Sequence, residues 1–332
     1  MARILITGAT GFIGSQLAQL ATRSGHQITA VSAVNNDVER GRLRDLHDAG
    51  IKVLAASFEE HEKLASAVRG QDAVIHLAAA QHEADKPESY FREVNVEGTR
   101  AMLELAVNSG VGRFVHGSTI GVYGEATDTT LTESSPIAPT NMYGRTKAQA
   151  ETVAKEYGPR ICLCIARISE TYGPGDMRLL KLFRAVQRQR YVTIGSGDNV
   201  HQLIYVEDLA RGLLAAADRP LVSGSLVILA GAETLTTDEM VRAIAAGIGS
   251  DLNLHHVPLW PFSLAAALFE ATMPRFGLKP LLHQRRLDFF RKSFRFSTQG
   301  AEQSLGFRST TSFSDGARLT GQWYRDHGLL TA

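Results

Sequence analysis

The chain has 332 residues, of which 44% are hydrophobic and 21% are charged. This composition is typical of a folded protein of one large or two ordinary domains, and it argues against a largely disordered chain. Thirty-five basic and thirty-four acidic residues give a net charge of +1. The near balance argues against a broad surface for nucleic acid or anionic membranes, so we expect a small-molecule partner.

The two cysteines and the start of the chain predict the compartment. Cys162 and Cys164 lie two residues apart in one apolar run, so their side chains point the same way and do not readily form a disulfide. The first apolar run begins at Arg3, and no apolar stretch reaches the roughly 20 residues of a membrane span. We expect a cytoplasmic protein with no signal peptide, integral membrane segment or metal site.

Through the first half, short apolar runs alternate with helical patterns. Strands are expected at 3–7, 27–32, 51–56, 72–78, 113–118 and 160–166, and helices at 12–24, 38–49, 59–69, 88–109 and 143–157. Near-continuous apolar strands separated by helices predict a parallel sheet covered on both faces, which is a doubly wound α/β fold.

After about residue 168 this alternation becomes less regular. Turn signals occur at 172–176 and 195–198, and further strands are expected at 202–206 and 225–230. The stretch "TTDEM" begins a helix, in which Thr237 is the expected capping residue. A second, smaller region is therefore expected.

The stretch "ITGATGFIGSQL" places Gly8, Gly11 and Gly14 between the first strand and the first helix. Such a turn brings backbone N–H groups and a helix N-terminus up to a pyrophosphate. The alternative is a tight turn that binds nothing, but the strand, the helix and their position favour the cofactor. We expect a Rossmann-type dinucleotide-binding domain over 1–170, with 200–230 returning to it. The smaller substrate-binding region would comprise mainly 171–199 and 231–332.

Residues suited to proton transfer follow the fifth strand. Tyr143 and Lys147 are four residues apart on a predicted helix, so both lie on one face. A neighbouring ammonium lowers the pKa of a phenol, which then exchanges a proton with a substrate oxygen at neutral pH. Thr119, with Ser118 beside it, lies at the carboxyl end of a strand, where ligands bind in open parallel sheets. Separately, such residues are usually a solvated pair and a turn, and only their combination indicates a site.

The chain resembles the extended short-chain dehydrogenases/reductases, the NAD(P)-dependent epimerase, dehydratase and hydroxysteroid-dehydrogenase group. The resemblance rests on "TGATGFIG" (7–14), "HLAA" (76–79), "NVEGT" (95–99), "STIGVYG" (118–124), "YGRTK" (143–147), "YGPGD" (172–176) and "LIYVEDLA" (203–210). It implies that Tyr143 is the general acid/base, that Lys147 holds the nicotinamide ribose, and that Thr119 binds the reacting oxygen. It also implies a dinucleotide site formed by Gly8, Gly11, Phe12, Ile13, Gly14, Ser32, Ala33, Leu77, Ala78, Ala79, Asn95 and Ser118.

The end of the second strand bears on the choice between NAD and NADP. Ser32 and Ala33 stand where NAD-using relatives often have an acidic residue, and Arg40, Arg42 and Arg44 follow. An arginine that reached the 2′-phosphate would favour NADP. Alternatively, these arginines form the solvated face of a helix and do not contact the cofactor. We expect NAD or NADP, with NADP slightly favoured.

Two departures from the family pattern bear on the substrate. Dehydratases have an Asp-Glu pair after the catalytic Ser/Thr, where this chain has Ile120 and Gly121. Nucleotide-sugar epimerases have an arginine for the diphosphate where this chain has His201, although Arg178, Arg184 or an arginine near the C-terminus would compensate. The "LIYV" form, with Tyr205, resembles the hydroxysteroid-dehydrogenase branch.

The apolar segment 254–276 is open to three interpretations. It could line a hydrophobic pocket, form a packed core helix, which base rates favour, or contact a membrane.

Taken together, these features predict an NAD(P)-dependent oxidoreductase that interconverts a secondary alcohol and a ketone, with a hydroxysteroid-like or β-hydroxy-acyl substrate. The alternative is a UDP-sugar 4-epimerase, and a third hypothesis is a non-catalytic NAD(P)-sensing protein. The resemblance further implies a homodimer formed through 88–109 and 143–157.

Overall fold

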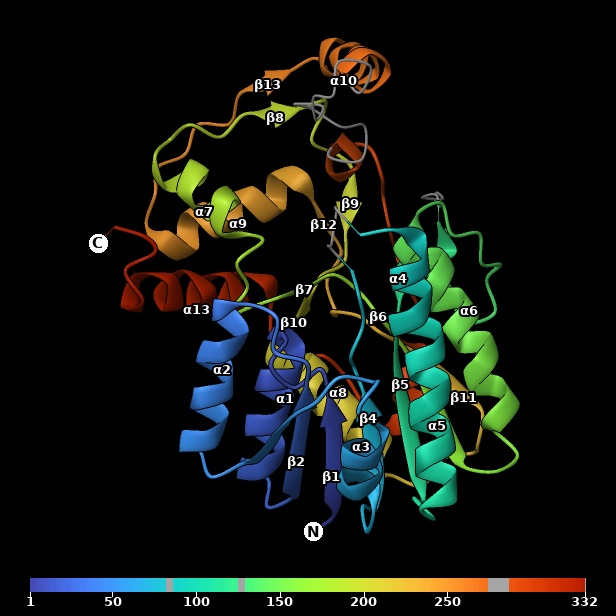
Figure 1. Ribbon diagram of the computed structural model, residues 1–332. Coiled ribbons are helices and arrows are strands. Elements are labelled where there is room, and N and C mark those ends of the chain that lie inside the picture. Colours follow the sequence, from blue (N-terminus) through green and yellow to red (C-terminus); the bar gives the residue numbers. More distant parts are fainter. Residues whose placement is uncertain (82–85, 125–128, 274–286, 332) are drawn as a thin grey trace.

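The computed structural model describes residues 1–81, 86–124, 129–273 and 287–331 (Figure 1). The elements of the first half are β1 (Arg3–Thr7), α1 (Phe12–Arg23), β2 (Gln27–Ser32), α2 (Asp37–Asp48), β3 (Lys52–Ala55), α3 (His61–Val68), β4 (Ala73–His76), α4 (Glu88–Arg92), the π-helix η1 (Glu93–Glu97), α5 (Gly98–Asn108), β5 (Arg113–Thr119), the 3-10 helix η2 (Ile120–Tyr123), α6 (Met142–Tyr157) and β6 (Cys162–Ile168).

The second half contains shorter strands and more widely spaced helices. They are β7 (Thr171–Tyr172), α7 (Leu180–Gln187), β8 (Thr193–Ile194), β9 (Val200–His201), β10 (Ile204–Tyr205), α8 (Val206–Asp218), β11 (Ser225–Leu229), β12 (Leu235–Thr236), α9 (Thr237–Ile248), β13 (His256–Val257), α10 (Trp260–Thr272), the 3-10 helix η4 (Asp288–Phe290), α12 (Gln299–Leu305) and α13 (Phe313–Asp326).

The central sheet has seven strands in the order β11-β6-β5-β4-β1-β2-β3. Every neighbouring pair in it is parallel. The chain runs outward from β1 to β3, returns to β4 beside β1, and then runs outward on the other side. This reversal confirms the predicted doubly wound, Rossmann-type fold and creates a switch point above β1 and β4, where such folds bind ligands.

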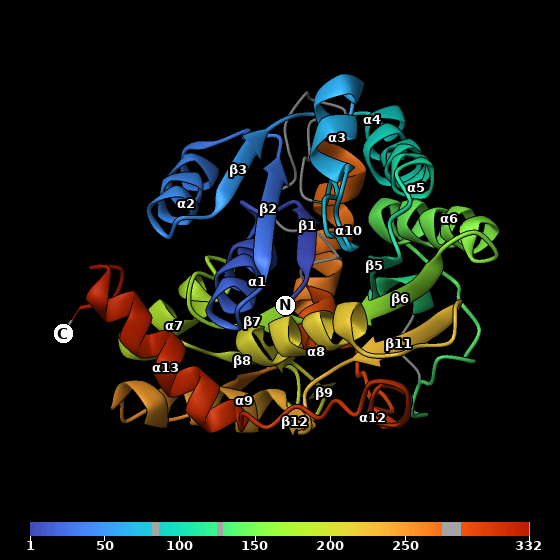
Figure 2. The ribbon, with the colours of Figure 1, turned by 90° about the horizontal axis from the view of Figure 1, so that it is seen from below.

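Helices cover both faces of the central sheet (Figure 2), and alternating side chains of its strands pack against the two helix layers. Ile4 and Ile6 of β1 face the core beside α1 and α8, whereas Leu5 faces the core beside α3, α5 and α6. The period of two in a strand produces this division. The sheet is therefore buried on both faces, as its near-continuous apolar strands require.

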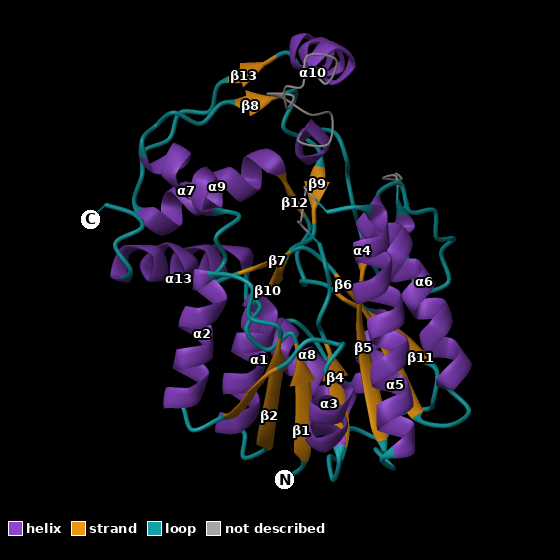
Figure 3. Cartoon of the chain, in the orientation of Figure 1, coloured by secondary structure: helices purple, strands orange, loops and turns teal. Residues whose placement is uncertain are grey.

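A second group of helices, α7, α9 and α13, lies beyond the carboxyl ends of the strands (Figure 3) and has its own apolar cluster. Helices α7, α9 and α13 pack around side chains that include Phe183, Met240, Ile244 and Tyr324. The short strands of this part pair outside the central sheet, as β10 with β7, β12 with β9 and β13 with β8.

Three local predictions differ from the structure. The helix expected over 88–109 is interrupted by η1, because the backbone widens by one residue around Asn95. The capping residue of α9 is Thr236, whose hydroxyl accepts a hydrogen bond from the Glu239 amide, and not Thr237. The strand expected at 202–206 is confined to β10, because Val206 already begins α8.

The apolar segment at 254–276 does not form a packed core helix. Ala266 is the buried residue of α10, whereas Trp260, Leu264 and Leu268 are 70%, 55% and 53% exposed. Residues 274–276 lie outside the described residues. Within the described ranges, no helix has the length and apolar character needed to span a membrane.

Candidate active site

The Gly-rich turn joins β1 to α1 at the switch point of the sheet. Gly8 has a φ of +67°, and a Cβ atom there would lie 2.8 Å from the Ala78 amide nitrogen. A Cβ at Gly14 would lie 2.2 Å from the Gly8 carbonyl oxygen. These two glycines therefore allow the turn to pack against the end of β4 and against its own helix.

Gly11 has a different environment, because a Cβ atom there would meet only the Gly8 carbonyl oxygen, at 3.0 Å. It is the N-cap residue of α1 and supplies no side-chain cap. In the described part of the chain, the amides of Phe12, Ile13 and Gly14 donate to no acceptor. Unpaired amides at a helix N-terminus fit the pyrophosphate of a dinucleotide.

The residues at the end of β2 are held by contacts within the protein. The Ser32 hydroxyl lies 2.6 Å from that of Thr10, and Ala33 is exposed. Arg42 donates to the carbonyl oxygens of Thr10 at 3.3 Å and Gly175 at 2.8 Å. Arg42 is thus neither part of a solvated helix face nor free to meet a 2′-phosphate without giving up these bonds.

The segment after β4 is fixed from both sides. The Thr7 hydroxyl accepts a hydrogen bond from the Ala78 amide at 3.2 Å. Buried Asn95 accepts from the Ala80 amide at 2.7 Å, donates to the Ala80 carbonyl oxygen at 3.0 Å, and donates to the Thr146 hydroxyl at 2.9 Å. Asn95 therefore ties this segment, which holds Leu77, Ala78 and Ala79, to α6, and its side chain is occupied by these bonds.

Thr119 and Tyr143 are brought together by the contact between η2 and the first turn of α6. A Cβ atom at Gly144 would lie 2.6 Å from the Gly121 carbonyl oxygen, so only glycine permits this approach. Asn141 caps α6 by accepting from the Gly144 amide at 2.8 Å. The Thr119 hydroxyl accepts from the Gly121 amide at 3.1 Å, which leaves its proton available for a substrate oxygen.

The pKa values of the tyrosine and the lysine are governed by burial. Burial raises the pKa of Tyr143 to about 12, and the positive charge of Arg178 acts in the opposite direction. Burial lowers the pKa of Lys147 to about 8, opposed by the charge of Glu151. Burial alone therefore moves the pKa of Tyr143 away from neutral pH, and the lowering of this pKa by Lys147 stays a prediction.

A buried ion pair below the site was not predicted from the sequence. Glu151 follows Lys147 by one helical turn and accepts hydrogen bonds from Arg167 at 3.0 and 2.8 Å. It also accepts from the Ser118 hydroxyl at 2.6 Å, so the proton of this hydroxyl is used within the protein. Arg167 donates to the Tyr123 hydroxyl at 2.9 Å. The available signal was an arginine within the apolar strand "CLCIARI".

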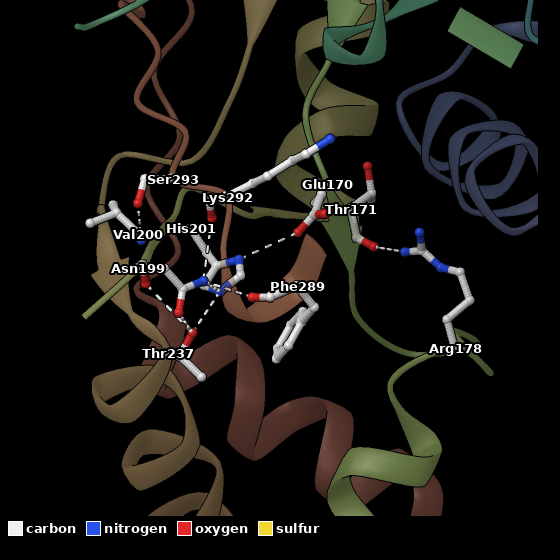
Figure 4. A network of polar contacts seen from close by, with 10 residues as sticks. All are labelled: Glu170, Thr171, Arg178, Asn199, Val200, His201, Thr237, Phe289, Lys292 and Ser293. Carbon is white, nitrogen blue, oxygen red and sulfur yellow. Dashed lines mark hydrogen bonds and ion pairs between the residues drawn. The ribbon is translucent and has the colours of Figure 1, made fainter. Parts of the chain in front are cut away.

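The three residues considered for a substrate diphosphate each have partners within the protein. His201 is buried, with Nε2 2.9 Å from the Thr237 hydroxyl and its ring 4.7 Å from that of Phe289 (Figure 4). Arg184 donates to the Leu329 carbonyl oxygen. Arg178 is 49% exposed and forms an ion pair with Asp176. Of the three residues, it is the one whose positive charge acts to lower the pKa of Tyr143. Tyr205, edge-on to Tyr172 at 5.7 Å, belongs to the second apolar cluster.

The parallel sheet and the Gly-rich turn at its switch point are those of a dinucleotide-binding protein, and comparison with known proteins identifies its family. The model of the NAD dependent epimerase/dehydratase family matches residues 4–228, so the chain belongs to this family, within the extended short-chain dehydrogenases/reductases. The predicted family and the prediction of an enzyme are thereby confirmed.

The chain is similar over most of its length to enzymes that act on nucleotide sugars. It is 28% identical to a dTDP-glucose 4,6-dehydratase of Streptomyces niveus, over 98% of this chain and 93% of the relative. It is 26% identical to a UDP-glucose 4-epimerase of Vibrio cholerae, over 96% and 94%. These relatives support the nucleotide-sugar alternative better than the expected hydroxysteroid-like substrate.

Two solved structures share the fold. DesIV, a dTDP-glucose 4,6-dehydratase from Streptomyces venezuelae with NAD bound, superposes with a TM-score of 0.77 at 27% identity, over 98% of this chain and 97% of that one. A UDP-glucuronic acid 4-epimerase from Bacillus cereus in complex with NAD gives a TM-score of 0.79 at 21% identity, over 98% and 99%. Both structures contain NAD, so they lend no support to the slight preference for NADP.

Proposed function

We propose that this protein is an NAD(P)-dependent 4-epimerase of a nucleotide-linked sugar. One observation carries the choice within the family: Thr119, Tyr143 and Lys147 are retained on adjoining elements, whereas the two positions after Thr119 are occupied by Ile120 and Gly121. The site therefore has groups for moving a proton on and off a sugar oxygen. At 120 and 121 it has no carboxylic acid to protonate a departing hydroxyl, which elimination of water requires.

The cofactor would be held by the Gly-rich turn and by the segment after β4. The amides of Phe12, Ile13 and Gly14 would donate to the pyrophosphate, and Leu77, Ala78 and Ala79 would border the dinucleotide. A dinucleotide held there would supply reversible hydride transfer at the sugar carbon. Either NAD or NADP is compatible with Ser32 and Ala33, and Arg42 would have to release Gly175 to reach a 2′-phosphate.

The chain itself supplies the proton chemistry. Thr119 would donate a hydrogen bond to the reacting oxygen, because its own oxygen already accepts from the Gly121 amide. Tyr143 would take the hydroxyl proton during oxidation and return it during reduction. Lys147 would favour the phenolate from one helical turn away. A positive charge beside Tyr143 is needed, since burial alone raises its pKa to about 12.

The test is an assay of the purified protein with UDP-glucose, with dTDP-glucose and with a panel of hydrophobic secondary alcohols, in the presence of NAD⁺ or NADP⁺. Product identity is followed by chromatography, and reduced-nicotinamide absorbance is followed in parallel. We expect an inverted sugar with no net cofactor reduction, and a loss of at least roughly a hundredfold in kcat for Tyr143→Phe. Net reduction with hydrophobic secondary alcohols would instead support a dehydrogenase. Turnover that survives undiminished in Tyr143→Phe would exclude the assigned mechanism.

Two structural proposals accompany this function. Residues 171–199 and 231–332 would form most of the substrate-binding region. Residues 1–170 and 200–230 would form the dinucleotide-binding domain.

A homodimer would form through α4, α5 and α6, which pack together as neighbours on one side of the sheet. Size-exclusion chromatography with light scattering tests the dimer, and a monomer at assay concentration would contradict it.

A further inference from the structure

His76 is a buried titratable residue that the proposed mechanism does not use. It is the last residue of β4, and its side chain is fully buried. Nδ1 lies 2.8 Å from the Thr7 hydroxyl oxygen, and Nε2 lies 3.1 Å from the Thr99 hydroxyl oxygen. Burial lowers the pKa of His76 to about 3, and the positive charge of Lys147 acts in the same direction. The imidazole is therefore neutral at neutral pH, so one of its nitrogens donates a hydrogen bond and the other accepts one.

The neighbouring hydroxyl groups determine which nitrogen carries the proton. The Thr99 hydroxyl donates to the Asn95 carbonyl oxygen at 2.7 Å, so its own oxygen accepts from Nε2 of His76. Nδ1 of the neutral ring must then accept, and its donor is the Thr7 hydroxyl. The Thr7 oxygen in turn accepts from the Ala78 amide at 3.2 Å. The hydrogen bonds therefore run in one direction, from the amide of Ala78 through His76 to the carbonyl oxygen of Asn95.

Asn95 extends this chain of hydrogen bonds to α6. Its side chain donates to the Thr146 hydroxyl at 2.9 Å. That hydroxyl lies 3.1 Å from each of the carbonyl oxygens of Met142 and Tyr143, to which it donates. Lys147 follows Thr146 in the same helix. A continuous path of hydrogen bonds therefore runs from the segment that borders the proposed dinucleotide site to the backbone of Tyr143.

The widened helix η1 depends on side chains for its shape. Its Gly98 cap donates an amide hydrogen bond to the Glu93 carbonyl oxygen, five residues back, where an α-helix spans four. The Thr99 hydroxyl, with His76 behind it, holds the Asn95 carbonyl oxygen within this turn. Because the side chain of Asn95 is bonded to the segment after β4 and to α6, a shift of η1 would disturb both.

We propose that His76 is a positioning residue for the reaction: by donating to Thr99 from Nε2, it holds η1 so that Asn95 connects the segment bordering the dinucleotide to α6. The inference rests on the proposed function, because it assumes a dinucleotide beside that segment and proton transfer at Tyr143. His76 itself takes no part in proton transfer, since its ring is buried and both nitrogens are engaged. It acts through Asn95 and Thr146, and a small displacement of reacting groups is costly in rate.

Three substitutions separate the two hydrogen bonds of the imidazole. His76→Gln places an amide near the position of Nε2 and keeps a donor for Thr99, whereas His76→Asn places its amide near Nδ1, toward Thr7. His76→Phe keeps a ring and removes both bonds. On the full chain, kcat with UDP-glucose and the dissociation constant of NAD⁺ or NADP⁺, whichever binds more tightly, are measured for each. His76→Phe and His76→Asn are expected to lower kcat at least roughly tenfold, and His76→Gln is expected to stay within about threefold of wild type.

Urea unfolding of the same variants separates positioning from a merely structural role. All three lose at least one buried hydrogen bond, so each is expected to lose about 1 kcal/mol or more in the free energy of unfolding. A structural role predicts that activity follows this loss of stability. Positioning instead predicts that His76→Gln recovers kcat relative to His76→Asn even where the two variants are equally stable.

His116 provides the matched control. It is fully buried, it pairs with His76 in the register of β4 and β5, and the two rings stack with their centroids 5.8 Å apart. Among the residues that the structure describes, neither ring nitrogen of His116 has a hydrogen-bond partner. His116→Phe therefore alters the same buried cluster without breaking the path of hydrogen bonds. It is expected to leave kcat and dinucleotide affinity within about threefold of wild type.

A double-mutant cycle tests the connection without relying on the reaction. Thr99→Val removes the hydroxyl that joins His76 to Asn95, and dinucleotide affinity is measured for Thr99→Val, for His76→Phe and for the double variant. Because His76 acts through Thr99, the double variant is expected to bind about as weakly as Thr99→Val alone.

The outcomes distinguish this inference from the proposed function. Equal kcat for His76→Gln and His76→Asn, equal losses in His116→Phe and His76→Phe, or additive losses in the cycle each overturn the role of His76, even if epimerisation is observed. Non-additive losses of dinucleotide affinity without any epimerisation support the connection through Thr99 and contradict the proposed reaction. Failure of wild type to bind either dinucleotide contradicts both.

Discussion

The carboxylate of Glu151 and the guanidinium of Arg167 lie 2.8 Å apart, with 1% and 3% of their side chains exposed. Glu151 stands on α6 one turn after Lys147, and Arg167 stands on β6 beside the strand that carries Ser118 and Thr119. The pair thus joins the helix of Tyr143 to the strand of Thr119. It fixes the spacing of the two elements on which the proposed chemistry depends.

Breaking this pair on one side should be strongly destabilising. Glu151→Gln leaves the Arg167 charge buried without a counter-ion, and we expect a loss of about 3 kcal/mol or more in the free energy of unfolding. Replacing both residues, as Glu151→Leu with Arg167→Met, should restore much of this loss, because no unpaired charge remains. Urea unfolding of the three proteins makes the comparison. If Glu151→Gln were as stable as wild type, the buried charge of Arg167 would not need its partner, and the prediction would be contradicted.

Lys147 should lower stability at neutral pH. Its pKa is lowered to about 8 in the folded protein from 10.5, so folding favours the uncharged form. The cost, about 3 kcal/mol, is present below pH 8 and is relieved as the pH rises toward 10.5, because the unfolded chain then binds more protons. Lys147→Met should therefore unfold with a higher free energy at pH 7. The difference from wild type should shrink between pH 8 and 10, and a difference independent of pH would refute this explanation.

Two glycines of the turn should respond differently to alanine. Gly14→Ala places a Cβ atom 2.2 Å from the Gly8 oxygen and should cost about 2 kcal/mol or more in stability. Gly11→Ala meets only one atom at 3.0 Å, so it should change stability little while weakening cofactor binding at least tenfold. Gly41→Ala, in open space on α2, is the control and should stabilise by roughly 0.5 to 1 kcal/mol. Calorimetric titration with NAD⁺ and urea unfolding separate the two effects.

Thr119 should be required for its hydroxyl and not for its shape. Thr119→Val keeps the branched side chain but removes the donor to the reacting oxygen, and we expect kcat to fall by roughly a hundredfold. Thr119→Ser keeps the donor and should stay within about tenfold of wild type. Initial rates with UDP-glucose, together with far-UV circular dichroism as a check on folding, test this pair. Equal rates for the two variants would remove Thr119 from the mechanism.

The fold class and the family followed from local patterns. Continuous apolar strands, helices of the expected length and glycines at 8, 11 and 14 are visible in the sequence because each reflects a local requirement of backbone or burial. The contacts of Asn95, Ser118 and His201 were not visible. Their hydrogen bonds to Ala80, Glu151 and Thr237 join residues 15, 33 and 36 positions apart, which no local pattern records.

The sequence by itself determined the parallel sheet, the dinucleotide turn and the Tyr143–Lys147 spacing, because strand and helix periods place those side chains wherever the chain goes. The tertiary structure alone decided the electrostatics. Burial dominates the pKa of Tyr143, and the charges of Glu151 and Arg167 are paired inside the protein. These properties depend on which charges are removed from water together, and only the packing of distant segments determines that.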